Sequence, residues 1–146
     1  MKKSFYFFMM ALLLLGASCK KTSTDSDYAS FNIGNASYSC SNPSVTVNTT
    51  NGTTYNTLTF PLSSGAKLVL NFKGSTASSY YLQSTSYYQD SQGNMYYGSS
   101  YTSTIAVTSY DFVNSVPVLT GTFDFEGYSQ GSYIEITNGK FTKVTN

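Results

Sequence analysis

The stretch LTGTFDFEGYSQGSYIEITNGKF, residues 119–141, decides the fold class of this chain. In its first arm, every second residue from Leu119 to Phe125 is apolar or glycine, and polar residues stand between them. That period of two is typical of a β-strand with one buried face. We predict a loop over 127–131 and a returning strand whose isoleucines face inward. The stretch therefore predicts an antiparallel β-hairpin.

The returning arm contains Asn138-Gly139, which favours either a further turn or a β-bulge within one strand. We favour the bulge because only residues 140–146 follow. One extra residue at this point also returns Phe141 to the inward face. The final strand is therefore expected to continue through the bulge.

The rest of the chain repeats this pattern of short alternating strands separated by turn signals. Gly34-Asn35 indicates a type II′ hairpin turn, and Asn51-Gly52 is a second hairpin signal. Pro61 indicates a strand end or a sheet edge, and a turn is expected over 111–115. We count about nine short strands, and no helix after residue 18. This pattern indicates an all-β fold, an antiparallel β-sandwich, with a β-barrel-like sheet as the alternative.

The first eighteen residues have the layout of a signal peptide. Lys2 and Lys3 precede the apolar run FYFFMMALLLL over 5–15, and Gly-Ala-Ser follows it. The run is too short for a membrane-spanning helix, which needs about 20 apolar residues. We therefore exclude residues 1–18 from the fold and predict a single domain over 28–146.

Cys19 directly follows Gly-Ala-Ser, and this junction resembles the lipobox of bacterial lipoproteins. The resemblance implies that Cys19 carries diacylglycerol on its sulfur, with fatty acids such as palmitate, and is the N-terminus after cleavage. Leucine usually stands three places before the cysteine, where this chain has Gly16. The alternative is an ordinary secretory peptide cut near Ser18. Residues 19–27 then form the lipidated cysteine and a flexible polar tether that reaches roughly 15 Å.

Three motifs stand in the last third of the chain, over 104–144. They are Tyr110-Asp111, Gly121-Thr122-Phe123-Asp124-Phe125 and Ile136-Thr137-Asn138-Gly139-Lys140-Phe141. Together they resemble the C-terminal signature of small lipoproteins common in the Bacteroidota and grouped as domains of unknown function. The segment from Phe31 to Tyr38 is similar to the opening Phe-x-x-Gly hairpin of that family. The resemblance implies a lipid-anchored location in the cell envelope, at the outer membrane with a periplasmic or surface face. It implies no catalytic residue.

Composition excludes several classes of function. After removal of the signal peptide, six lysines stand against seven acidic residues, so a basic surface for nucleic acid is absent. The chain has no histidine, which removes the commonest general base and the commonest zinc ligand. With Cys19 committed to lipid, no intrachain disulfide is possible, and Cys40 is expected to be a small apolar residue of a strand. We therefore predict a protein that is not an enzyme and binds no metal and no cofactor.

Three weaker motifs favour ordinary structural roles. Ser64-Gly-Ala-Lys67 matches the Ser-x-x-Lys pattern of penicillin-recognising enzymes, but it leads from a turn into a strand. The segment from Asp90 to Asn94 resembles a calcium loop without its closing glutamate, and a hairpin turn is favoured. A carboxylate pair for glycoside hydrolysis could be sought among Asp111, Asp124, Glu126 and Glu135. The last three are expected on outward strand faces, which more often indicates a solvated surface.

A tyrosine cluster in the middle of the chain is the candidate binding site. In each tyrosine doublet the two rings are expected to point to opposite faces of the sheet. Exposed rings can stack on sugars or anchor a protein partner, whereas the alternative is that tyrosine simply suits a pleated surface. The leading hypothesis is a lipid-anchored envelope protein with a non-catalytic β domain for binding or structure, and the second is a carbohydrate-binding surface module. The candidate contact residues are Tyr80, Tyr81, Tyr87, Tyr88, Tyr96, Tyr97 and Tyr101.

Overall fold

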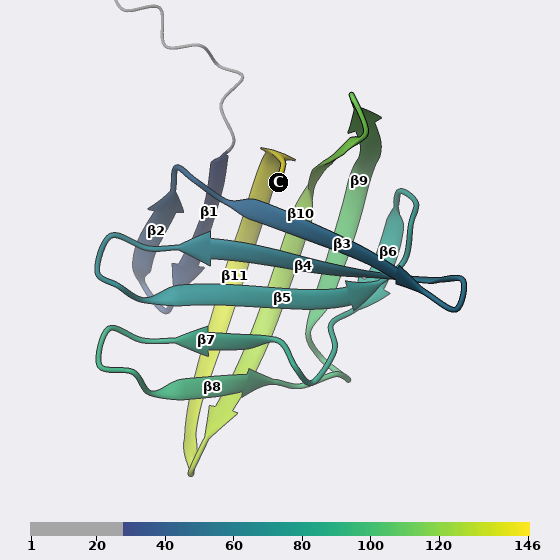
Figure 1. Ribbon diagram of the computed structural model, residues 1–146. Coiled ribbons are helices and arrows are strands. Elements are labelled where there is room, and N and C mark those ends of the chain that lie inside the picture. The colour runs from purple at the N-terminus through teal and green to yellow at the C-terminus, as the bar shows by residue number, and fades with distance from the viewer. Residues whose placement is uncertain (1–27) are drawn as a thin grey trace, which may run out of the picture.

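The computed structural model describes residues 28–146, which form eleven β-strands (Figure 1). This part of the chain contains no helix, so the prediction of an all-β antiparallel fold is confirmed. The strands are β1 (Tyr28–Ile33), β2 (Ala36–Cys40), β3 (Ser44–Thr50), β4 (Thr53–Pro61), β5 (Lys67–Lys73), β6 (Ser78–Tyr81), β7 (Tyr87–Gln89), β8 (Met95–Gly98), β9 (Thr104–Val113), β10 (Val116–Ser129) and β11 (Ser132–Val144).

All eleven strands belong to one sheet that curls over itself into two layers. The main path is β2-β1-β11-β10-β8-β7-β5-β4-β3, and β9 and β6 extend from β10 on a second branch. In Figure 1, strands β3, β4, β5, β7 and β8 run across those of the layer behind them, which includes β1, β9, β10 and β11. Residues 116–124 of β10 pair with β9, whereas Gly127 and Tyr128 pair with β8. The layers are therefore joined through β10, as in a barrel-like sheet.

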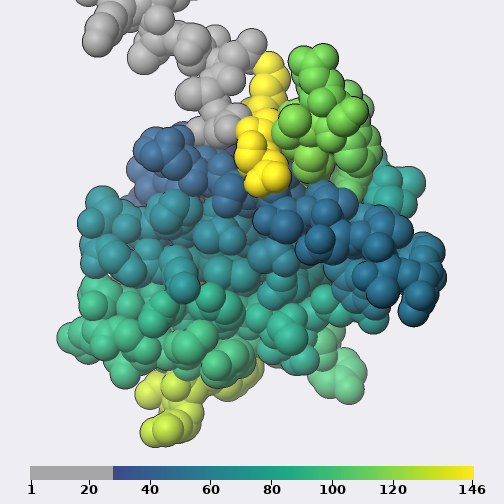
Figure 2. Space-filling model, in the orientation of Figure 1, coloured from purple at the N-terminus to yellow at the C-terminus, as the bar shows by residue number. Residues whose placement is uncertain are grey.

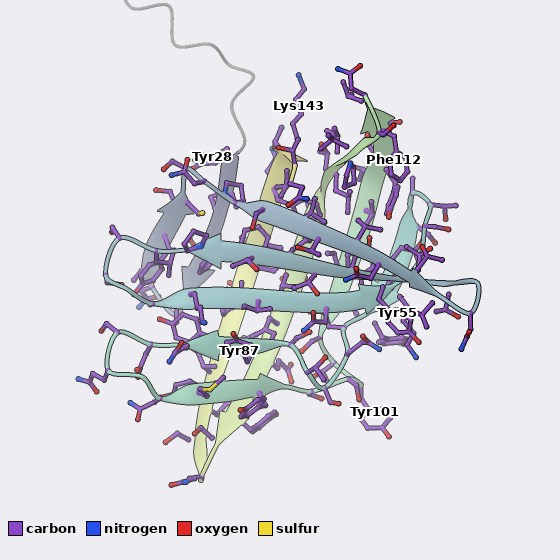
Figure 3. The ribbon with its side chains drawn as sticks, in the orientation of Figure 1. Tyr28, Tyr55, Tyr87, Tyr101, Phe112 and Lys143 are labelled. Carbon is purple, nitrogen blue, oxygen red and sulfur yellow. The ribbon has the colours of Figure 1, made fainter. Side chains whose placement is uncertain are left out.

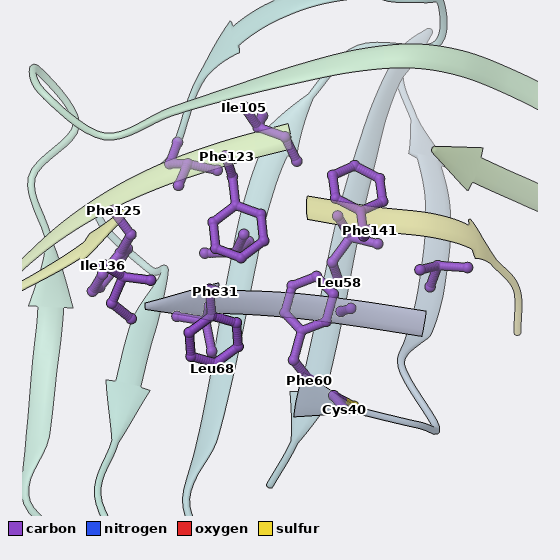
Figure 4. Packing of buried hydrophobic residues seen from close by; sticks show 14 of the residues in the cluster. Phe31, Cys40, Leu58, Phe60, Leu68, Ile105, Phe123, Phe125, Ile136 and Phe141 are labelled. Atoms are coloured by element: carbon purple, nitrogen blue, oxygen red, sulfur yellow. The ribbon is translucent and has the colours of Figure 1, made fainter. Parts of the chain in front are cut away.

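The core lies between the two layers and is rich in phenylalanine (Figure 4). The ring centroid of Phe123 lies 5.4 Å from that of Phe60 and 5.9 Å from that of Phe31. Because Phe60 belongs to β4 and Phe123 to β10, the contact between these two rings holds the layers together. Cys40 is also buried here, and burial raises the pKa of its thiol, as expected for an apolar strand residue.

The predicted bulge in the last strand is confirmed. Asp124 of β10 faces both Thr137 and Asn138 of β11, and the register between β1 and β11 shifts at the same place. Asn138 has a φ of +54°, which a short polar side chain tolerates. The extra residue returns Phe141 to the inward face, where it is fully buried.

The two expected hairpin signals in the first half also form turns. Gly34 joins β1 to β2 with a φ of +57°, the sign that a type II′ turn requires at this position. Asn51 and Gly52 join β3 to β4 with φ of +51° and +74°. Pro61 is the last residue of β4, in agreement with the predicted strand end.

Two turns in the second half are shorter than the sequence indicated. The turn expected over 111–115 is limited to Asn114-Ser115, and the loop expected over 127–131 is limited to Gln130-Gly131. All four of these residues have positive φ, which suits two-residue hairpins because it matches the twist of the strands. Ser and Gln seldom adopt this conformation, so the short turns were missed. The strands are correspondingly longer, and eleven form instead of about nine.

A partly buried hydrogen-bond chain also joins the layers. The Tyr110 hydroxyl on β9 donates to Oδ1 of Asn56 on β4 at 2.8 Å, and Nδ2 of Asn56 donates to the Gly74 carbonyl at 2.7 Å. Asn56 is buried, and burial raises the pKa of Tyr110, so this hydroxyl remains a donor.

We expect Tyr110→Phe to lower the free energy of unfolding by about 1 to 3 kcal/mol, because it leaves a buried carbonyl oxygen without its donor. Urea denaturation followed by circular dichroism measures this loss. Tyr128→Phe is the matched control, since Tyr128 is exposed. Equal stability of the Tyr110→Phe variant and the unmodified chain would contradict this role.

Candidate binding face formed by tyrosines

The tyrosine doublets of β7 and β8 present one ring to each face of the sheet. Tyr88 and Tyr96 are paired on the inner face, with ring centroids 6.1 Å apart, and both contribute to the core. Tyr87 and Tyr97 are paired on the outer face, with ring centroids 6.2 Å apart. Figure 3 shows Tyr87 on the layer that contains β7 and β8. The predicted alternation is therefore confirmed for these two doublets.

The third doublet follows the same alternation at a different place. Tyr80 of β6 packs against Phe72 with ring centroids 5.3 Å apart, and its hydroxyl donates to the Thr76 carbonyl at 2.8 Å. Its neighbour Tyr81 is 67% exposed. Because β6 pairs with β9, Tyr81 does not join the tyrosines of β7 and β8. Tyr101, in the loop after β8, is 89% exposed and is likewise separate.

Four outward-facing tyrosines lie side by side on four neighbouring strands, and we call them the tyrosine row. Tyr87 is the register partner of Tyr97, Tyr97 is that of Tyr128, and Tyr128 is that of Tyr133. The row thus crosses β7, β8, β10 and β11. Adjacent strands lie about 4.8 Å apart, so the row extends over roughly 15 Å. That length suits several consecutive rings of an extended ligand.

The side chains of the row are accessible to a ligand. Tyr97, Tyr128 and Tyr133 are 51%, 52% and 51% exposed, so about half of each side chain is available for contact. Tyr128 and Tyr133 support one another, with ring centroids 5.1 Å apart and planes inclined by 50°. The Tyr97 hydroxyl donates to the sulfur of Met95 at 3.6 Å. These contacts limit the motion of the rings and reduce the entropy that binding would cost.

Charged groups flank the row at both ends. The ammonium of Lys67 lies 5.5 Å from the centroid of the Tyr87 ring, within the range of a cation–π contact. Glu126 and Glu135 are register partners, each two residues from a tyrosine of the row and on the same outer face. Glu126 accepts a hydrogen bond from the Thr102 hydroxyl at 2.6 Å. The two carboxylates provide hydrogen-bond acceptors beside the aromatic surface, and the ammonium provides donors.

Tyr133 stays protonated over a wide pH range. Desolvation raises the pKa of Tyr133, and the negative charges of Glu126 and Glu135 raise it further. The hydroxyl is therefore a donor beside two carboxylate acceptors. A ligand that carries many hydroxyl groups can use both.

Sequence reasoning missed Tyr128 and Tyr133. Both fall in or beside the segment expected to be a loop over 127–131, so neither was assigned a face. The strand period contained the missing signal, because Phe125 and Gly127 continue the inward alternation and leave Tyr128 outward. A two-residue turn then places Tyr133 opposite Tyr128. Of the four tyrosines in the row, only Tyr87 and Tyr97 were among the candidate contact residues predicted from the sequence.

The weaker motifs have structural roles. Lys67 begins β5 and covers the Tyr87 ring, and the Ser64 pattern leads into no helix. The Asp90 carboxylate accepts bonds from the backbone N–H groups of Gln92 and Asn94, each at 2.9 Å, which stabilises the favoured hairpin turn. Hydrogen bonding to these groups lowers the pKa of Asp90, with the Asn94 side chain as the largest cause. Within residues 28–146, no group of three acidic or cysteine side chains could hold a metal ion.

The predicted lipidation site, Cys19, lies outside the described residues, as do the signal peptide over 1–18 and the tether over 19–27. The described part begins at Tyr28, the first residue of β1. Among these residues, no helix has the length and apolarity needed to cross a bilayer. Comparisons with protein-family models, with curated proteins and with solved structures found no match for the chain.

Proposed function

We propose that this chain is a lipid-anchored protein of the bacterial cell envelope whose β domain binds carbohydrate without chemical catalysis. The lipobox-like junction at Cys19 supports attachment to the outer membrane, with a periplasmic or surface face. The observation that carries the binding role is the tyrosine row, in which three exposed rings and the partly buried ring of Tyr87 lie in register across four strands.

A row of aromatic rings matches the chemistry of a carbohydrate. The ring faces of sugars carry C–H groups that pack on aromatic surfaces, while their edges carry hydroxyl groups that need donors and acceptors. The tyrosine row offers rings at its centre and the Glu126 and Glu135 carboxylates beside it. The linear arrangement favours an extended oligosaccharide over a single sugar.

A non-catalytic role agrees with the chemistry of the described residues. Cys40, the only thiol among them, is buried, and burial raises its pKa, so a nucleophilic thiolate is disfavoured. The sequence contains no histidine to serve as a general base. The proposed activity is therefore capture and display of a glycan at the membrane surface.

Replacing Tyr97 and Tyr128 together with alanine is expected to weaken glycan binding by about tenfold or more. Truncation of a central aromatic contact commonly costs more than about 1 kcal/mol, and about 1.4 kcal/mol corresponds to a factor of ten. A glycan array with the unmodified chain would identify a ligand, and calorimetric titration would compare the variants.

Tyr101→Ala is the matched control, because it removes a more exposed tyrosine that lies outside the row. We expect it to leave the affinity unchanged. A chain that binds no glycan, or a double variant that binds as tightly as the control, would contradict carbohydrate binding by this face. Hydrolysis of a bound glycan would contradict the non-catalytic part of the proposal.

A further inference from the structure

The hairpin between β9 and β10 carries exposed apolar side chains at its end. We call Phe112, Val113 and Val116 the apolar tip; they are 60%, 56% and 38% exposed. None of them belongs to the core, and the Phe112 ring packs against that of Tyr110, with ring centroids 5.8 Å apart. The segment from Phe112 to Val118 contains no charged residue. Exposed apolar residues gathered in this way mark a contact surface.

The apolar tip projects beyond the rest of the sheet. The pairing of β10 with β11 begins only at Leu119, so Val116 and Val118 have β9 as their only strand neighbour. Figure 2 shows the tip as a bright green projection at the top of the molecule. Val113 and Val116 also line a groove of about 620 Å³, together with polar and charged residues that include Asp111 and Lys143. The fold therefore exposes these side chains on a two-stranded ribbon.

The position of the tip within the fold indicates what it contacts. Tyr28, Lys143 and Phe112 all lie at the upper end of the molecule in Figure 3. Tyr28 is the register partner of Thr142 on β11, next to the end of that strand. From β1 to β9 there are three strand spacings, or roughly 15 Å. The described chain thus begins at the same end of the sheet as the hairpin that carries the tip.

The length of the preceding chain limits how far Cys19 can lie from this end. Nine residue steps separate Cys19 from Tyr28, and a fully extended chain covers at most about 3.5 Å per residue. Cys19 therefore lies within roughly 30 Å of Tyr28 in any conformation. A lipid on Cys19 would hold this end of the domain, and not the end with the tyrosine row, near the bilayer.

We propose that the apolar tip inserts into the polar–apolar boundary of the bilayer as a second membrane contact. The proposal rests on the lipid anchor at Cys19. Apolar side chains at this boundary leave water, which favours insertion. Two contacts fix the orientation of the domain and direct the tyrosine row away from the membrane.

The chain contains no tryptophan, so one introduced tryptophan reports its own environment. We would purify the full chain carrying Phe112→Trp from bacterial membranes and reconstitute it in vesicles of phosphatidylethanolamine and phosphatidylglycerol. The expected result is a shift of the emission to shorter wavelength and loss of most of its intensity when the acyl chains are brominated. Val113→Trp, on the other face of the ribbon, is expected to behave in the same way. Tyr101→Trp is the control and should show neither effect.

The outcomes separate this proposal from the anchor. If the chain binds the vesicles but the tryptophan at position 112 or 113 emits as it does in water, the result overturns the tip contact. The lipid anchor is then still supported. A shift to shorter wavelength without quenching by brominated lipid means that a second copy or another protein covers the tip, and it also overturns the contact. If the chain stays in solution and does not associate with the vesicles, the result overturns the lipid anchor at Cys19, and the tip contact with it.

Discussion

Phe123→Ala is expected to lower the free energy of unfolding by about 3 to 5 kcal/mol, the range for removal of a fully packed phenylalanine. The Phe123 ring is 2% exposed and lies between three other rings. Its centroid is 5.4 Å from Phe60, 5.9 Å from Phe31 and 6.4 Å from Phe141. Alanine would leave a cavity at the junction of the two layers, and neighbouring backbone within the ladders cannot collapse to fill it.

A loss of this size is a large part of the stability of a domain, which is typically about 5 to 15 kcal/mol. Urea denaturation of the purified chain, followed by far-ultraviolet circular dichroism, measures it. Thr122→Ala is the matched control, since Thr122 is the preceding residue of the same strand and is exposed. A loss below about 1 kcal/mol for Phe123→Ala would contradict the central place of this ring in the core.

Cys19→Ala is expected to release the protein from the membrane fraction. The substitution removes the sulfur that carries the diacylglycerol, and each buried CH₂ of an acyl chain contributes about 0.8 kcal/mol to membrane binding. Two or more chains together hold a protein stably, whereas the apolar tip alone offers only three exposed side chains. The variant should therefore shift from the membrane pellet to the soluble fraction.

Cys40→Ala is the control, because it removes the other thiol of the chain from a buried position and leaves the N-terminal motif intact. It should stay in the membrane pellet. Mass spectrometry of the N-terminal peptide should find a lipid on Cys19 of the unmodified chain. Retention of the Cys19→Ala variant, together with an unmodified Cys19 in the parent chain, would contradict the anchor and favour an ordinary secretory peptide.

The candidate binding face was only partly predictable from the sequence. The alternation within each doublet predicted that one of its two rings faces outward, because side-chain direction in a strand depends on local geometry, but it did not say which ring. Tyr81 and Tyr101 were candidates as well, but they lie on β6 and in the loop after β8. Tyr128 and Tyr133 were missed, since they join the row only through the pairing of β10 with β8. The sequence therefore indicated a tyrosine cluster, but not which of its rings are exposed or which of them are neighbours.

Local patterns determined the strand class, the inward face of the last hairpin and the bulge beside Asn138, because each depends on residues close together in the chain. The pairing of Tyr97 with Tyr128 joins residues far apart in sequence, and no local preference specifies it. Only the tertiary structure decided this pairing. Strand β10 pairs with β9 along its first part and with β8 near its end, because the sheet curls around its phenylalanine core. The length of β10 separates the apolar tip from the tyrosine row, since Val116 of the tip begins this strand and Tyr128 of the row lies near its end.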